Sequence, residues 1–135
     1  MDNFPTIIVD FLVVGKNFII EELTEELNIF PTEIRRIDDW PEAIKNNPNL
    51  PEELRPRNVW CICYKEEQCE EIEMPVQKIL EQIMNRFCEK NSLEKCLCIT
   101  IHAEAMHLPD MTLSSNTVSY LGRIGVQLSF DIYTY

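Results

Sequence analysis

The end of the chain alternates between apolar and polar side chains more regularly than any other segment. Apolar residues occupy every second position from Val126 to Ile132, and polar residues fill the positions between them up to Tyr133. A period of two places one set of side chains on each face of a β-strand. The pattern predicts a strand over 126–133 with its apolar face turned inward and its polar face turned outward.

Four other segments have strand character. Segment 6–14 is rich in Ile, Val and Phe, and segment 95–103 has Leu97, Ile99 and Ile101 on one face, whereas 33–37 is short and partly polar. Segment 58–65 is apolar on both faces, a pattern typical of a central strand that is covered on both sides.

Helical spacing of apolar residues appears twice between these strands. It predicts one helix over 18–27, with Asn17 as its N-cap, and a second from Pro75 to about Phe87. A short third helix is expected from Ser114, its N-cap, through Gly122, with Gly125 as the stop. The four prolines between 41 and 57 predict a loop with at most a short helical turn.

The resulting order is strand, helix, strand, strand, helix, strand, helix, strand. This order predicts an α+β fold with a single mixed, mostly antiparallel sheet of about five strands and helices packed on one face. A chain of 135 residues is long enough for one domain with a sizeable core, so we expect residues 1–135 to form a single α+β domain.

Charge is distributed unevenly along the chain. The net charge is −11, and residues 1–74 hold 17 acidic and 7 basic side chains, whereas residues 75–135 hold 6 and 5. Phosphate recognition depends on clustered Lys and Arg, so this charge argues against a nucleic-acid partner. A negative face favours encounter with a basic protein, although charge alone is better explained by simple solubility. The candidate partner-binding residues are Glu66, Glu67, Glu70, Glu71, Glu73, Asp38 and Asp39.

The amino-terminal segment lacks a positively charged region before its apolar stretch, and no apolar run reaches the ~18 residues of a membrane helix. We therefore expect a cytoplasmic protein with no membrane partner. The six cysteines are then expected to be reduced and to behave as small buried hydrophobes.

Three groups of side chains have some of the character of a functional site. Two Cys-x-Cys pairs, 61–63 and 96–98, suggest zinc, but thiols two residues apart on a strand should stand too far apart to bind one ion, and we expect no metal. His102, Glu104 and His107 match no metal-binding signature. The third group comprises polar residues of the expected outer sheet face, where an acid beside a histidine would suit acid–base chemistry. These residues are Asp10, His102, Gln127, Ser129, Asp131 and Tyr133.

Several short motifs together resemble a bacterial family known as domain of unknown function 4279. The motifs are Leu27-Asn28-Ile29-Phe30-Pro31-Thr32, Asn58-Val59-Trp60-Cys61-Ile62, the leucine-rich helix from Pro75 to Phe87, Leu121-Gly122 and Asp131-Ile132-Tyr133. Asn28 stands where that family usually has Gly. The resemblance implies one α+β domain and brings no catalytic residues with it; small families of this kind are suspected in some cases of being immunity proteins encoded beside toxins.

No phosphate-binding loop, dinucleotide fingerprint or nucleophile elbow is present, so we expect a protein-binding module with no cofactor rather than an enzyme. The most specific hypothesis is an immunity protein that neutralises a basic toxin domain. One alternative is a small-molecule-binding protein or enzyme that uses the polar sheet face around Asp131 and His102. Another is a homodimer joined through that face.

Overall fold

Strand β1 (Thr6–Gly15) forms the middle of the sheet, and its side chains show why the sequence folds in this way. Ile7, Val9, Phe11 and Val13 are fully buried on one face, whereas on the other face the residues from Ile8 to Val14 are only partly buried. The computed structural model describes residues 3–51, 54–84, 86–87 and 93–135. Burying one face of β1 therefore fixes the side of the sheet on which the helices pack.

The five strands follow the order β2-β3-β1-β4-β5. β3 (Asn58–Glu66) and β4 (Glu94–Ala103) flank β1 and run antiparallel to it, and β2 (Glu33–Arg35) pairs antiparallel with β3. β5 (Val126–Thr134) is parallel to β4 and forms the other edge. The expected α+β fold, with a mixed and mostly antiparallel sheet, is confirmed.

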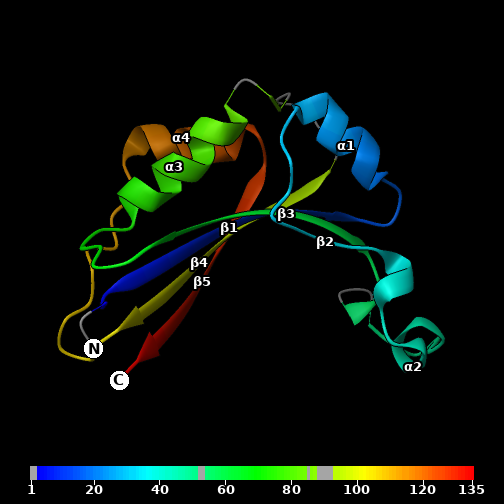
Figure 1. Ribbon diagram of the computed structural model, residues 1–135, viewed down its shortest axis with the longest axis horizontal. Coiled ribbons are helices and arrows are strands. Elements are labelled where there is room, and N and C mark those ends of the chain that lie inside the picture. Colours follow the sequence, from blue (N-terminus) through cyan, green and yellow to red (C-terminus); the bar gives the residue numbers. More distant parts are fainter. Residues whose placement is uncertain (1–2, 52–53, 85, 88–92) are drawn as a thin grey trace.

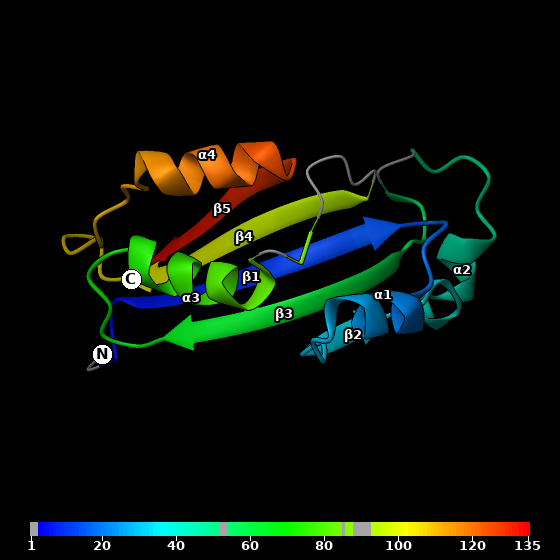
Figure 2. The ribbon, with the colours of Figure 1, turned by 90° about the horizontal axis from the view of Figure 1, so that it is seen from above.

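Helices α1 (Ile20–Leu27), α3 (Glu73–Ile83) and α4 (Ser115–Arg123) cover one face of the sheet (Figures 1 and 2). The short α2 (Glu42–Lys45) and the 3-10 helix η1 (Ile37–Asp39) lie in the proline-containing connection before β3. The expectation that β3 is covered on both sides holds only in part: these three helices all lie on one face, and on the other face Cys61 is buried whereas Val59 and Cys63 are half-buried. Trp60 and Ile62 are buried on the helix-covered face.

The helix ends differ in how well the sequence predicted them. Ser114 is the N-cap of α4 and accepts a hydrogen bond from Thr117 N at 3.2 Å, as expected. Gly125 follows that helix with a φ of 73°, which confirms its role as the stop. Asn17 does not cap α1, because that helix starts later, with Ile19 at the N-cap position and no side-chain hydrogen bond.

The last strand departs from its expected burial. On β5, the side chains that share the helix-covered side with Leu97, Ile99 and Ile101 of β4 are Leu128, Phe130 and Ile132. The three β4 residues are fully buried, whereas the three β5 residues are 38%, 40% and 48% exposed. The expectation of a buried apolar face on this strand is therefore wrong. The strand lies at the edge of the sheet, and Figure 1 shows it running away from α4.

Candidate functional site

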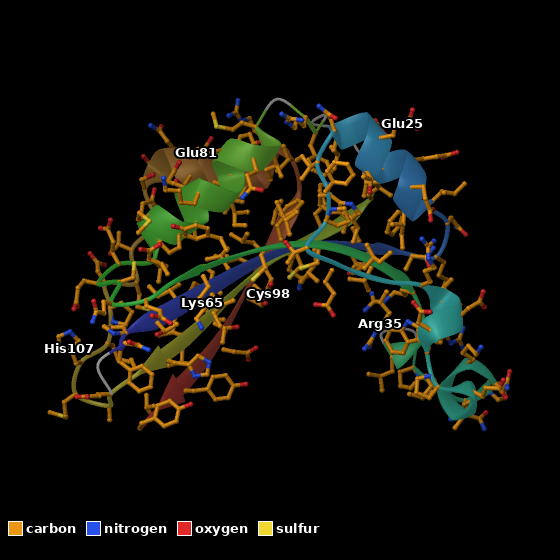
Figure 3. The ribbon with its side chains drawn as sticks, in the orientation of Figure 1. Glu25, Arg35, Lys65, Glu81, Cys98 and His107 are labelled. Atoms are coloured by element: carbon orange, nitrogen blue, oxygen red, sulfur yellow. The ribbon has the colours of Figure 1, made fainter. Side chains whose placement is uncertain are left out.

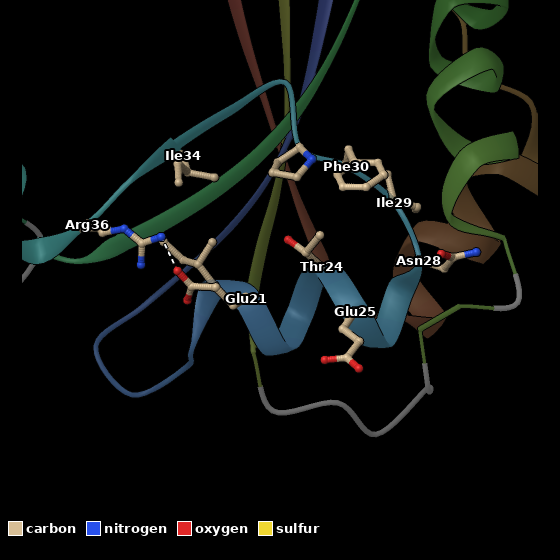
Figure 4. Close-up of a pocket in the computed structure, with 10 residues that line it drawn as sticks. Glu21, Thr24, Glu25, Asn28, Ile29, Phe30, Ile34 and Arg36 are labelled. Atoms are coloured by element: carbon tan, nitrogen blue, oxygen red, sulfur yellow. Dashed lines mark hydrogen bonds and ion pairs between the residues drawn. The ribbon is translucent and has the colours of Figure 1, made fainter.

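A hollow lies between α1 and β2 (Figure 4). It has a volume of about 430 Å³. Its wall on one side is α1, and on the other it is the segment that turns back from α1 into β2. The lining residues are Ile20, Glu21, Thr24, Glu25, Asn28, Ile29, Phe30, Pro31, Ile34 and Arg36. We call this hollow the α1–β2 groove.

The position of α1 follows from its apolar stripe. Ile20, Leu23 and Leu27 are buried against the sheet. Thr24 lies between them on the groove side and accepts a 3.0 Å hydrogen bond from Trp60 Nε1, which ties the helix to β3. The floor of the groove is therefore held by core contacts rather than by a loose surface segment.

The turn after α1 depends on Asn28. This residue adopts a left-handed conformation, with a φ of 55° and a ψ of 41°, and its N–H reaches Glu25 O at 3.2 Å. The chain then reverses and leads through Phe30 into β2. The Phe30 side chain is 90% exposed, so an aromatic ring stands at the rim of the groove without cover from the chain itself.

Carboxylates line the other rim of the groove. Glu21 pairs with Arg36 across it, and this hydrogen bond lowers the pKa of Glu21 and raises that of Arg36 (Figure 4). Glu25 points away from the sheet (Figure 3) and, like Glu22 and Glu26, is exposed. The groove thus combines an apolar floor, an exposed aromatic ring and a rim with two glutamates, of which Glu21 is paired with Arg36 and Glu25 is exposed.

The acidic segment before α3 was the main candidate for partner contact, but most of its carboxylates have partners within the molecule. Glu66 accepts a hydrogen bond from the Tyr64 hydroxyl, Glu67 lies 3.6 Å from Lys65 Nζ, and Glu70 lies 2.8 Å from His107 Nε2. Glu71 is exposed. These contacts leave fewer free carboxylates in this segment than its sequence suggests.

Glu73 is the most strongly bound of these acids. It accepts hydrogen bonds from Ser114 N at 3.1 Å, Ser114 Oγ at 2.8 Å and Thr117 Oγ1 at 2.6 Å, and Gln77 lies at 3.1 Å. Burial opposes ionisation of Glu73, yet the hydrogen bonds outweigh it and lower the pKa of the carboxyl group. Glu73 therefore joins the start of α3 to the start of α4 and has a structural role.

The two aspartates proposed beside this segment lie elsewhere on the surface. Both are exposed and belong to the 3-10 helix η1. Asp39 Oδ2 accepts a hydrogen bond from Arg36 N at 2.9 Å, and Asp38 O lies 3.5 Å from Lys45 Nζ. Their position after β2 places them in the same part of the chain as the α1–β2 groove.

The polar residues of the outer sheet face share one face as the strand alternation predicts. Asp10 pairs with Cys98, His102 with Tyr133, and Asp131 with Thr100. Gln127 lies on the same face, opposite Cys96. His102 stacks on Tyr133 with ring centroids 5.0 Å apart, and its Nδ1 lies 3.0 Å from the Tyr135 hydroxyl. In the part of the chain that the structure describes, no hydrogen bond joins His102 to Asp131.

A scan of protein-family models matches residues 5–135 to a domain of unknown function, DUF4279. This chain belongs to the DUF4279 family. No curated protein and no solved structure matches it significantly. The family description assigns no activity, so function has to be argued from the DUF4279 fold itself.

Two of the segments that resemble the family lie next to α1 in this fold. The Leu27–Thr32 motif of the DUF4279 pattern forms the turn that walls the α1–β2 groove. Asn28 occupies the left-handed position in which Gly is usual, and Asn is the next most tolerant residue there. The motif with Trp60 supplies the indole that anchors α1. Two of the segments on which the resemblance rests are therefore joined through α1.

In this DUF4279 chain, one Cys-x-Cys pair has its two sulfur atoms closer together than expected. Cys96 Sγ and Cys98 Sγ lie only 3.4 Å apart, so the expectation that two thiols of one strand stand too far apart is wrong for this pair. Ser129 Oγ lies 3.2 Å from Cys98 Sγ. Burial and the contact with Cys98 raise the pKa of Cys96 to about 11. Cys88 lies outside the described residues.

The other Cys-x-Cys pair surrounds Asp10. Cys61 Sγ lies 3.6 Å from Asp10 Oδ1, and burial and this carboxylate raise the pKa of Cys61. Burial and a hydrogen bond with Asp10 raise the pKa of Cys63 to about 11. Across the described ranges, no group of three or more His, Cys, Asp or Glu side chains is arranged to hold a metal ion.

The same ranges contain no helix that is both long and apolar enough to cross a bilayer.

Sequence reasoning did not find the α1–β2 groove. Its residues were assigned to a helix, a turn and a short strand, and none was named as a candidate. The one available signal was Phe30, a large apolar residue outside any expected buried pattern.

Proposed function

We propose that this chain is a cytoplasmic protein-binding module and acts as an immunity protein against a basic toxin domain. The observation that carries the proposal is the α1–β2 groove, in which an apolar floor and an exposed ring meet a rim of carboxylates. Interfaces bind through buried apolar and aromatic anchors surrounded by a polar rim, and the groove has both parts.

An extended segment of the partner fits the geometry of the groove. β2 is the outermost strand of its side of the sheet, and Ile34 on it is 39% exposed beside α1. An extended peptide can pair with an edge strand while its alternate side chains enter neighbouring pockets. In this arrangement an apolar side chain contacts Ile34 and Phe30, and a Lys or Arg side chain meets Glu25.

Long-range charge supports the same class of partner. The first 74 residues, which include the whole groove, hold 17 acidic and 7 basic side chains. A field of this sign accelerates encounter with a basic protein and weakens as salt screens it. The groove alone is smaller than a standard interface of ~800 Å² per partner. The exposed Asp38 and Asp39 next to it would extend the contact.

Inhibition of a neighbouring toxin gives the direct test. The product of the gene adjacent to this one is purified, its affinity for the chain is measured by calorimetry, and its toxic activity is assayed with and without the chain. We expect tight, salt-sensitive binding and loss of toxicity. Lack of both binding and inhibition would contradict the immunity proposal.

Two matched pairs of variants locate the contact. Glu25→Lys should weaken binding at least about tenfold, because it places a like charge against a basic partner. Glu81→Lys makes the same change on the exposed side of α3 and should have little effect (Figure 3). Phe30→Ala should weaken binding, whereas Met106→Ala, at a residue that is 97% exposed, should not. If the two controls weaken binding and the two groove variants do not, the contact lies elsewhere.

A further inference from the structure

The edge strand β5 carries a row of apolar side chains that the helices leave uncovered. This strand has nine residues and is the last in the order β2-β3-β1-β4-β5. Its exposed apolar side chains Leu128, Phe130 and Ile132 form a continuous row along the helix-covered side. Edge strands with this character pair readily with other strands, and proteins usually protect them.

The reason for the exposure is the twist of the sheet. α4 contacts the beginning of β5 after the turn at Gly125, and the strand then diverges from the helix towards its carboxyl end (Figure 1). A twisted sheet carries an edge strand away from a straight helix laid across it. The row therefore becomes more exposed along the strand, from Leu128 at 38% to Ile132 at 48%.

The backbone of β5 presents hydrogen-bonding groups on the same edge. Tyr135, directly after the strand, donates its N–H to Ala103 O and accepts from Ala105 N, so both of its backbone groups point to the β4 side. Backbone direction alternates along a strand. Val126, Leu128, Phe130, Ile132 and Thr134 consequently direct their N–H and C=O groups to the free edge.

This edge carries few of the usual barriers to pairing. No proline or glycine lies within Val126–Thr134, and Asp131 is its only charged residue. Proline, bulges and inward-pointing charges are the devices that normally block edge-to-edge association. The opposite edge differs, because β2 has only three residues and includes Glu33 and Arg35.

The β5 strand of a second copy of the chain can pair antiparallel with this edge over its full length. A two-fold axis through Phe130, the central residue of β5, sets all nine residues of one strand opposite the nine of the other. Leu128 then faces Ile132 of the second copy, and the apolar row remains on one side. Asp131 faces a serine, Ser129 of the second copy, so no two like charges meet.

The charge distribution favours the same occupant. Residues 75–135 hold 6 acidic and 5 basic side chains, so the part of the chain that contains β5 is almost neutral. Contact through β5 therefore keeps the two acidic halves apart. It also leaves the α1–β2 groove free, because β2 and β5 are at opposite edges of the sheet.

We infer that two copies of this chain associate by antiparallel pairing of their β5 strands into one continuous sheet of ten strands. This contact differs from dimerisation through the outer sheet face, since it uses the strand edge and the apolar row. It does not depend on the proposed function of the groove.

Sedimentation velocity on the full chain over a range of concentrations tests the inference. The weight-average mass should rise from that of one chain towards that of two. Phe130→Lys places a charge beside the two-fold axis and should keep the mass at one chain, with an unchanged circular dichroism spectrum. The matched control Ile34→Lys puts the same charge on the β2 edge and should still dimerise.

Hydrogen exchange on the unmodified chain gives a second measurement that does not depend on any variant being folded. The amides of Leu128, Phe130 and Ile132 should be protected at high concentration and should exchange faster on dilution, whereas that of Ser129 should stay protected by β4. A chain that remains monomeric at all concentrations, or a dimer lost in Ile34→Lys but kept in Phe130→Lys, would overturn the inference. Fast exchange of the three amides in the concentrated protein would do so as well.

Discussion

At the scale of single residues, Asn28 determines how α1 leads into β2. It ends the helix in the left-handed conformation, and the N–H groups of Asn28 and Ile29 bond to carbonyls of the last helical turn. Only Gly adopts this conformation without a steric cost, and Asn tolerates it better than other residues. The direction of the chain along the α1–β2 groove therefore depends on one side chain.

Substitution of Asn28 tests whether its left-handed conformation stabilises the fold. We expect Asn28→Ala to lower the free energy of unfolding by about 1 kcal/mol. Alanine keeps the Cβ that opposes a left-handed backbone but lacks the polar side chain that lets Asn tolerate this conformation. Asn28→Gly should stay close to the parent protein. Urea denaturation measures both, with Asn116→Ala on the exposed side of α4 as a control that should not destabilise. An equal loss in the Gly and Ala variants would contradict this account of the turn.

At the scale of elements, α3 and α4 are joined by a carboxylate rather than by apolar packing alone. Glu73 in the first turn of α3 accepts hydrogen bonds from Ser114 and Thr117 at the start of α4. The helix start supplies unpaired N–H groups and a positive dipole end, both of which stabilise an ionised acid. The acidic segment was interpreted as a partner surface because its sequence shows charge but not these contacts.

This contact makes acid stability depend on Glu73. The pKa of its carboxyl group is lowered in the folded state, so its contribution is complete above the unfolded value of 4.5 and is lost as pH falls through the folded pKa. We expect Glu73→Gln to reduce the free energy of unfolding at neutral pH by about 1–2 kcal/mol and to flatten its decline below pH 4.5. Denaturation at a series of pH values measures this, and Glu71→Gln is the exposed control. If the free energy of unfolding of Glu73→Gln declines below pH 4.5 as steeply as that of the parent protein, a group other than Glu73 causes the loss of stability in acid.

At the scale of the whole molecule, the chain carries a net charge of −11, with most of the excess in its first half. Self-repulsion of this kind lowers the stability of a compact state, and salt screens it. The pairs Glu21–Arg36 and Lys65–Glu67 are exposed and offset little of it. The negative charge that would attract a basic partner therefore lowers the stability of the folded chain in the absence of that partner.

Salt should accordingly stabilise the isolated protein. We expect the thermal unfolding midpoint to rise as NaCl is added from low to physiological ionic strength. Glu22→Lys combined with Glu26→Lys, both exposed on α1, should reduce this rise, whereas Lys78→Glu on α3 should increase it. Circular dichroism melts at several salt concentrations measure the effect. A midpoint that is independent of salt, or that falls, would contradict the role given to net charge.

The sequence by itself determined the five strands, the three longer helices and the α+β class, because these follow from local periodicity. It also identified Ser114 and Gly125 as helix ends and placed Asp10 and His102 on one sheet face. These features depend on neighbours along the chain, where the sequence pattern is complete.

Only the tertiary structure decided which surfaces remain open. The alternation of β5 looks the same in an edge strand as in a buried one, so the exposure of Phe130 depends on strand order and twist. The α1–β2 groove joins Thr24 to Ile34, and the partners of Glu73 lie about 40 residues away along the chain. Contacts of this kind arise from packing of distant segments, which no local pattern encodes.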